Sequence, residues 1–258
     1  MNPTTSKTIA YITDIHLGQQ VQLENELGSS KMSYRTNPDE HKANFLSILD
    51  DIQKREIKEV VFGGDIGLEE TNAWFFNTLK KYQFTLLMVL GNHDTFTEVS
   101  KHYDNGLTNG KDEMNYGYED KYWKYIYLDS SSNRVSDTQL YWLTQQLNTP
   151  KKILLFIHHP VLKIDTPLDQ IGAALKGRDE LKKILVDSSA EITIFCGHYH
   201  MTDATTEKNI TQFSSVAGSY QILKESPVVK LDQITFGYRL IQIDADSIKT
   251  DTVLLKTN

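Results

Sequence analysis

Potential metal ligands follow five apolar segments of the sequence, each at the point where the apolar run stops. Carboxylate, imidazole and amide groups of this kind can bind Mn, Fe, Zn or Co. The segments at 9–12, 60–62, 84–90, 153–157 and 192–196 are followed, in that order, by Asp14 and His16, by Asp65, by Asn92 and His93, by His158, and by His198 and His200. The packing of a core explains the apolar runs, but it does not explain why ligands recur at the same end of successive ones.

Two of these motifs are ambiguous when each is taken alone. Asp14 and His16 are two residues apart, so in an extended segment they share a face and can converge on one point. Such a pair is nevertheless more often a strand end with two solvated side chains. Gly91-Asn92-His93-Asp94 begins with ordinary turn residues. The hypothesis of a metal site therefore depends on the five ends meeting at one edge of a sheet, where α/β folds bind ligands.

The rest of the pattern predicts alternating strands and helices. Apolar strands are expected at about 7–13, 59–62, 84–90, 153–157 and 192–196, with paired strands at 115–118 and 125–129. Helices are expected from a cap at Asp39 to Arg55, around 74–82, at 136–147 and at 178–186. Alternating segments at 212–217, 238–243 and 250–255 are expected to form a second sheet. The stretch 18–38 is polar without a sustained period, and we expect a long surface loop that could act as a lid.

The composition fits one globular domain, residues 1–258. A net charge of -7 provides no basic face, which disfavours long nucleic acids. Small anionic substrates would need local help, which bound cations could supply. The single cysteine, Cys196, is typical of a small buried residue rather than a nucleophile. The polar N-terminus and the early interruption at Asp14 predict neither a signal peptide nor a membrane span, so we expect a cytoplasmic protein.

The ordered series Asp14-x-His16, Gly64-Asp65, Gly91-Asn92-His93-Asp94, His158 and Gly197-His198-x-His200 resembles the calcineurin-like metallophosphoesterase family. Each motif is weak alone, but five in order make the resemblance specific, and they cover about residues 7–200. The resemblance implies an α/β (α+β) fold, a four-layer αββα sandwich of two mixed β-sheets with helices outside. It also implies two metal ions, of Mn, Fe, Zn or Co, at the carboxyl ends of the strands.

The resemblance also implies a role for each motif residue. The first ion would be bound by Asp14, His16 and His200, the second by Asn92, His158 and His198, and both would be bridged by Asp65. His158 is chosen over His159 because the family's spacing is His-x-Pro and Pro160 supplies the proline. His93 is implied to protonate or stabilise the leaving oxygen, with Asp94 orienting its ring.

Departures from other branches of the superfamily narrow the implied activity. Leu90 replaces the arginine that protein phosphatases carry before Gly-Asn-His, and Leu68 replaces the tyrosine ligand of purple acid phosphatases. The chain length, the Gly-Asn-His-Asp form and the segments His158-His159-Pro160 and Leu128-Asp129-Ser130 are similar to the bacterial class III cyclic-nucleotide phosphodiesterase and glycerophosphodiesterase branch.

We therefore expect an enzyme that hydrolyses phosphodiesters of these types, by in-line attack of a metal-bridging hydroxide on phosphorus. One alternative is a phosphomonoesterase, or a nuclease or nucleotide hydrolase, of the same superfamily. An alternative from another class is a catalytically inactive metal-binding regulatory protein. Inactivity is disfavoured because every ligand position and His93 are filled.

Overall fold

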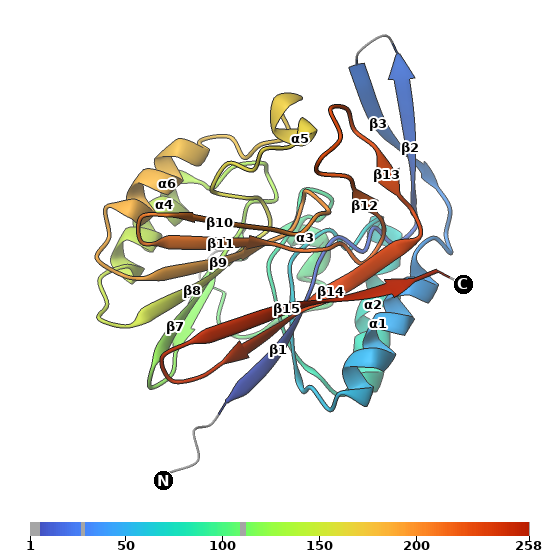
Figure 1. The fold of residues 1–258 in the computed structure, drawn as a ribbon. Helices are drawn as coiled ribbons and strands as arrows, with labels where there is room; N and C mark the ends of the chain where they lie inside the picture. The colour runs from blue at the N-terminus through green and yellow to red at the C-terminus, as the bar shows by residue number, and fades with distance from the viewer. Residues whose placement is uncertain (1–5, 27–28, 109–111, 258) are drawn as a thin grey trace.

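Two mixed β-sheets packed face to face form the centre of the molecule (Figure 1). The computed structural model describes residues 6–26, 29–108 and 112–257. The first sheet has the strand order β15 (Ile248–Lys256), β14 (Thr235–Ile243), β1 (Lys7–Ile12), β4 (Glu59–Phe62) and β5 (Thr85–Met88). The second has the order β10 (Asp203–Glu207), β11 (Ile210–Ser214), β9 (Ile192–Cys196), β8 (Lys152–Ile157), β7 (Trp123–Leu128) and β6 (Tyr116–Glu119). Strands β1, β4 and β5 are parallel, as are β7, β8, β9 and β11, so within each sheet their carboxyl ends share an edge.

Helices cover the outer face of each sheet (Figure 1). The first sheet is covered by α1 (Lys42–Lys54) and α2 (Asn72–Tyr82), and the second by α4 (Asp137–Gln146) and α6 (Arg178–Val186). Connections contain the short helices η1 (Glu69–Thr71), α3 (Phe96–Val99) and α5 (Pro167–Gln170), and the two-stranded ribbons β2 (Gln19–Glu26) with β3 (Ser29–Thr36) and β12 (Gln221–Ile222) with β13 (Leu231–Asp232). The four layers confirm the predicted fold class. Within the described ranges, no helix has the length and apolarity needed to cross a membrane.

Strand β8 contributes to two cores at once. Ile153, Leu155 and Ile157 belong to the cluster that also contains buried residues of α4 and α6, whereas Leu154 and Phe156 belong to the cluster between the sheets. Successive side chains of a strand point to opposite faces. A strand that is buried on both faces therefore requires a continuous apolar run. For this reason the sequence alone predicted β8.

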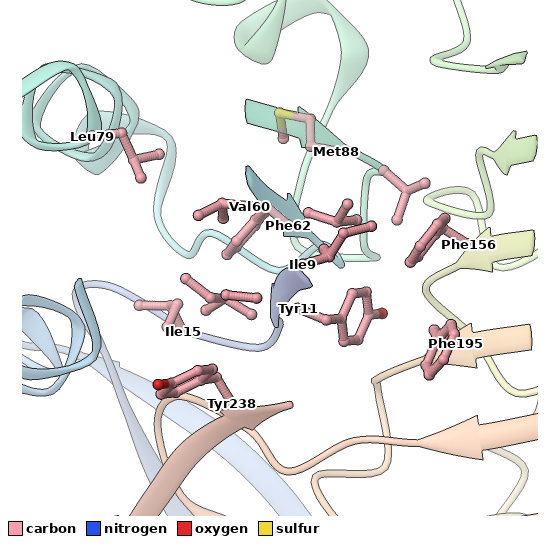
Figure 2. Close-up of a cluster of buried hydrophobic side chains, with 14 of the residues drawn as sticks. Ile9, Tyr11, Ile15, Val60, Phe62, Leu79, Met88, Phe156, Phe195 and Tyr238 are labelled. Atoms are coloured by element: carbon pink, nitrogen blue, oxygen red, sulfur yellow. The ribbon is translucent and has the colours of Figure 1, made fainter. Parts of the chain in front are cut away.

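Aromatic rings fill the space between the sheets. The ring centroid of Tyr11, in β1, lies 5.9 Å from that of Phe156 and 6.2 Å from that of Phe195, both in the second sheet (Figure 2). Phe156 also stacks on Tyr127 at 5.0 Å and on Phe195 at 5.7 Å. Ring pairs of this kind contribute about 0.5–1.5 kcal/mol each beyond the burial of their area. This aromatic cluster fixes the separation of the two sheets, and with it the separation of their strand ends.

The prediction of a loop at 18–38 is wrong, because most of this stretch forms the antiparallel hairpin β2–β3. Val21, Leu23, Met32 and Tyr34 of the hairpin pack in one apolar cluster with residues of later segments. Their spacing of two is a strand pattern, but the intervening residues are so polar that no sustained period stands out. Figure 1 shows the hairpin, in blue, projecting past the edge of the first sheet.

Two smaller predictions are also corrected. Helix α1 begins at Lys42 after His41, which has a left-handed backbone and no side-chain cap; the carboxylate of Asp39 instead pairs with Nζ of Lys42 at 3.0 Å. The C-terminal strands do not form a sheet of their own, because β11 joins the second sheet beside β9 while β14 and β15 extend the first beside β1. An alternating pattern predicts a strand, but it does not identify the partner of that strand.

Replacing Phe156 by alanine should lower the free energy of unfolding by about 3–5 kcal/mol, because the ring is fully buried and its removal leaves a cavity between the sheets. Leu254→Ala is the control: Leu254 is 59% exposed, and its loss should change stability by less than about 0.5 kcal/mol. Urea unfolding followed by circular dichroism measures both. Equal stability of the two variants would show that the aromatic cluster does not hold the sheets together.

Candidate metal centre

The carboxyl ends of three strands of the first sheet and two of the second bring the potential ligands together. Three groups of side chains each place their ligand atoms within 4.8 Å of one another: Asp14, His16 and His200; His16, Asp65 and His93; and Asp65, His158 and His198. His16 and Asp65 each belong to two of these groups. The side chains therefore form one continuous cluster rather than separate sites.

The side chains of the cluster lie close enough together to bind the same metal ion. Nε2 of His200 lies 3.3 Å from Oδ1 of Asp14 and 3.1 Å from Nε2 of His16. Oδ2 of Asp65 lies 3.3 Å from Nε2 of His158 and 3.5 Å from Nε2 of His16. Asp65 therefore stands between the side chains from the first sheet and those from the second.

In each of three imidazoles, a backbone carbonyl group binds one ring nitrogen and so determines which nitrogen is left to face the site. Nδ1 of His158 lies 2.8 Å from the carbonyl oxygen of Gly63, and Nδ1 of His200 lies 2.9 Å from that of Tyr220. For His198 the bonded nitrogen is Nε2, 2.9 Å from the carbonyl oxygen of Ala173. A carbonyl oxygen only accepts hydrogen bonds, so each bonded nitrogen carries a hydrogen, and in the neutral form of the ring the other nitrogen presents a lone pair. This is the arrangement by which a metal-binding histidine is oriented.

Two buried polar atoms have no hydrogen-bond partner among the described residues: Nε2 of His158, in the cluster, and Oδ1 of Asn92, which lines the same cavity as Asp65 and His198. A buried acceptor without a partner costs free energy, so such atoms in native structures call for a ligand or an ion. Both atoms can bind a metal ion. The residues present therefore fit the metal ions that the sequence motifs imply.

The electrostatics of the cluster favour a cation. Burial disfavours the charged form of the two carboxyl groups, yet neighbouring imidazoles hold the pKa of Asp14 and of Asp65 below the usual range. Burial likewise acts to lower the pKa of His158, but the carboxylates of Asp65 and Asp14 outweigh it and raise that pKa to about 10. Two ionised carboxylates thus create a strong negative potential at the centre of the cluster.

The backbone at these strand ends is strained. Non-glycine residues with positive φ are uncommon, yet five residues of the cluster have it, with φ between 49° and 67°: Asp14, His16, Asp65, His198 and His200. Each such conformation costs on the order of 1–3 kcal/mol and concentrates at functional sites. Hydrogen bonds between the turns hold it in place, because the carbonyl oxygen of Asp65 accepts from the backbone N–H of Ile15 and of His16 at 3.0 and 3.2 Å.

Two glycines permit the close approach of these turns. A Cβ atom on Gly91 would collide with the carboxylate of Asp65, and one on Gly197 would collide with the side chains of Asp14 and Thr13. These are steric requirements of the cluster itself, because the atoms that would collide belong to the proposed ligands or their neighbours. The glycines in the two motifs therefore leave room for carboxylates rather than only allowing a turn.

The structure corrects the expected role of Asp94. Its carboxylate accepts backbone N–H groups of Asp65, Ile66 and Gly91 at 2.7, 2.9 and 2.9 Å. Burial, together with the charge of Asp65, raises the pKa of Asp94 to about 7. The side chain points back into the turn, so it holds the ends of β4 and β5 together instead of orienting the ring of His93.

The ring of His93 has a hydrogen-bond partner in Gln19, a residue that the sequence analysis did not predict. Nε2 of Gln19 lies 2.9 Å from Nδ1 of His93. Tyr34 was also missed, and its ring stacks on His16 and meets His93 edge-on. Both residues belong to the hairpin, so the alternation of Val21 and its neighbours was the only signal that could have found them.

The structure separates the two neighbouring histidines of the fourth motif. His158 belongs to the cluster, whereas Nδ1 of His159 lies 2.9 Å from Oγ of Ser130. The ring of His159 packs against that of His198 with 4.1 Å between centroids. His159 thus packs behind a cluster residue, and His158 stays the candidate ligand of the two.

The cluster forms the floor of a cavity of about 340 Å³. One wall is apolar and comes from the hairpin and the segments around α5 and β12; it contains Met32, Leu168, Ile171, Ala173 and Ile222. The cavity is large enough for a small molecule whose polar end rests on the cluster and whose remainder lies against the apolar wall.

A sequence profile described as calcineurin-like phosphoesterase matches residues 7–202. The chain belongs to this family. It is therefore a metal-dependent phosphoesterase, as its five motifs indicate.

Bacterial relatives match most of the chain. It is 29% identical over 204 residues to a probable glycerophosphodiester phosphodiesterase of Arcobacter nitrofigilis, covering 74% of each chain. It is 25% identical over 268 residues to a 3',5'-cyclic-nucleotide phosphodiesterase of Nostoc, covering 98% of this chain and 94% of that one. Among solved structures, a dimetal phosphatase from Danio rerio superposes with a TM-score of 0.60 at 13% identity, covering 95% of this chain and 98% of the other. This likeness agrees with the αββα fold.

Asp65→Asn should impair the binding of both expected metal ions together, because its carboxylate lies between His16 of the first sheet and His158 of the second. We expect about two ions per chain in the wild type and fewer than about one in the variant. Inductively coupled plasma mass spectrometry after loading with Mn or Zn and gel filtration measures this ratio. His93→Ala is the matched control and should keep both ions; a fall to one would make His93 a ligand.

Proposed function

We propose that this site binds two metal ions and hydrolyses small phosphodiesters. One ion would be held by Asp14, His16 and His200, the other by Asn92, His158 and His198, with Asp65 shared. The observation that carries the proposal is the position of Oδ2 of Asp65, within 3.5 Å of Nε2 of both His16 and His158. A shared carboxylate reduces the repulsion between two cations about 3.5–4 Å apart.

The chain's own residues prepare the site for this reaction. Metal ions, when bound, would activate a water molecule and neutralise charge on the phosphoryl oxygens. The carbonyl groups of Gly63, Tyr220 and Ala173 hold three imidazoles with their lone pairs toward the site. His93 lines the same cavity and has its Nδ1 occupied by Gln19, which leaves Nε2 to stabilise the leaving oxygen.

The residues that line the cavity are our reason for proposing a diester rather than a monoester as the substrate. A diester has a substituent on each side of phosphorus, and the apolar wall offers a surface for the one that does not lie over His93. Lys31 is the one lysine or arginine among the described residues that line the cavity, so a phosphate dianion would find few cationic partners beyond the metal ions. The names of the bacterial relatives, a cyclic-nucleotide and a glycerophosphodiester phosphodiesterase, agree with this reading.

The enzyme reconstituted with Mn or Zn should therefore prefer diesters. We expect kcat/KM for bis(p-nitrophenyl) phosphate to exceed that for p-nitrophenyl phosphate by at least about tenfold, which corresponds to about 1.4 kcal/mol of transition-state stabilisation. A panel of cyclic nucleotides and glycerophosphodiesters then identifies the natural class. Asp65→Asn, purified in the same way, controls for contaminating phosphatases.

Each of the other outcomes would replace the proposal with a specific alternative. A preference for monoesters would make the protein a phosphomonoesterase, and cleavage of oligonucleotides in preference to small diesters would make it a nuclease. Two bound ions without hydrolysis of any of these substrates would indicate a regulatory protein with an inactive site.

A further inference from the structure

Gln19 connects one candidate metal ligand to the residue that faces the leaving group. It is the first residue of β2 and is 8% exposed. Its Oε1 lies 2.8 Å from Nδ1 of His16, and its Nε2 lies 2.9 Å from Nδ1 of His93. One buried amide thus makes a hydrogen bond to each of the two imidazoles.

The directions of these two hydrogen bonds depend on each other. Nε2 of His16 faces Asp65 and His200, so a His16 that binds a metal ion does so through Nε2 and carries its hydrogen on Nδ1. That hydrogen is donated to the carbonyl oxygen of Gln19. The NH₂ group of the same amide then faces Nδ1 of His93, which must accept. Reversing the amide would place its NH₂ group against the N–H of His16.

The structure assigns Gln19 a specific task on this basis: it is a positioning residue that fixes the orientation and tautomer of His93, so that the ring presents Nε2–H to the substrate. This inference rests on the proposed function, because it takes His16 as a metal ligand. It goes beyond it by identifying what holds His93, a task that Asp94 does not perform. Metal binding at His16 sets the orientation of the Gln19 amide, and that orientation in turn sets the tautomer of His93.

The surroundings of Gln19 restrain the same two rings. Its backbone N–H donates to the carbonyl oxygen of His16 at 3.0 Å, which fixes the start of the hairpin against the metal-binding turn. The ring of Tyr34 stacks on His16 with 5.4 Å between centroids and meets His93 edge-on at 5.0 Å. The hydroxyl of Tyr34 lies 3.0 Å from that of Tyr220, so this ring is itself held in place.

Gln19→Glu tests the assignment most sharply, because a carboxylate only accepts hydrogen bonds. Glutamate would still accept from His16, but it would also accept from His93 and so draw a hydrogen onto Nδ1 of that ring. ¹⁵N chemical shifts of the histidine rings in Zn-loaded protein report this directly, with His93→Ala used to assign the signal. The wild type should show Nδ1 of His93 without hydrogen and Nε2 with it, and Gln19→Glu should show Nδ1 protonated.

Kinetics provide a second readout that a merely structural role would not move. Gln19→Glu and Gln19→Met should lower kcat about tenfold or more for diesters with poor leaving groups, should affect good leaving groups less, and should keep about two ions per chain. Gln22→Glu, which adds the same charge at an exposed position of the same strand, is the matched control and should leave kcat unchanged.

Two results would overturn the assignment: a hydrogen on Nδ1 of His93 in the wild type, or an unchanged His93 signal in Gln19→Glu. The ¹⁵N measurement does not require turnover. A failure of the assignment is therefore distinguishable from a failure of the proposed diesterase activity, which the substrate panel tests separately.

Discussion

The buried carboxylate of Asp65 is the group on which the geometry of the site depends. Its Oδ2 lies near histidines from both sheets, and its Oδ1 accepts the backbone N–H of His93 at 2.8 Å. Its backbone carbonyl accepts from the turn that carries His16, and its backbone N–H donates to Asp94 at 2.7 Å. The ends of β1, β5 and β8 are thus tied to one residue at the end of β4. A buried charge without compensation costs several kcal/mol, so this residue determines what else must be present around it.

The strained turns follow from that constraint. Carboxylates and imidazoles from five strand ends must point at one small volume, and the extended backbone of a strand would direct alternate side chains away from it. Left-handed turns at Asp14, Asp65 and His198 redirect the side chains, and glycines at 91 and 197 leave room for the carboxylates. The aromatic cluster around Phe156 supplies stability that offsets this strain, because it holds the two sheets in one relative position.

The sequence was most informative where burial dictated residue type. Strand β8 could be predicted because it is buried on both faces, and the candidate ligand at its end, His158, stood out against that apolar run. The hairpin could not, because one side of it is polar and its apolar side chains are too few to show a period. Gln19 and Tyr34 were missed with it. The hydrogen-bond partners of Asp94 could not be predicted either, because they are backbone groups whose positions depend on how two turns pack.

The central claim is that one carboxylate is shared by two metal ions at the junction of the sheets. Anomalous diffraction from crystals of the Mn-loaded protein tests it directly. The account predicts two anomalous peaks about 3.5–4 Å apart, with the carboxylate of Asp65 between them and Asn92 beside the peak that His158 and His198 also contact. A single peak, or two peaks of which only one contacts Asp65, would contradict it.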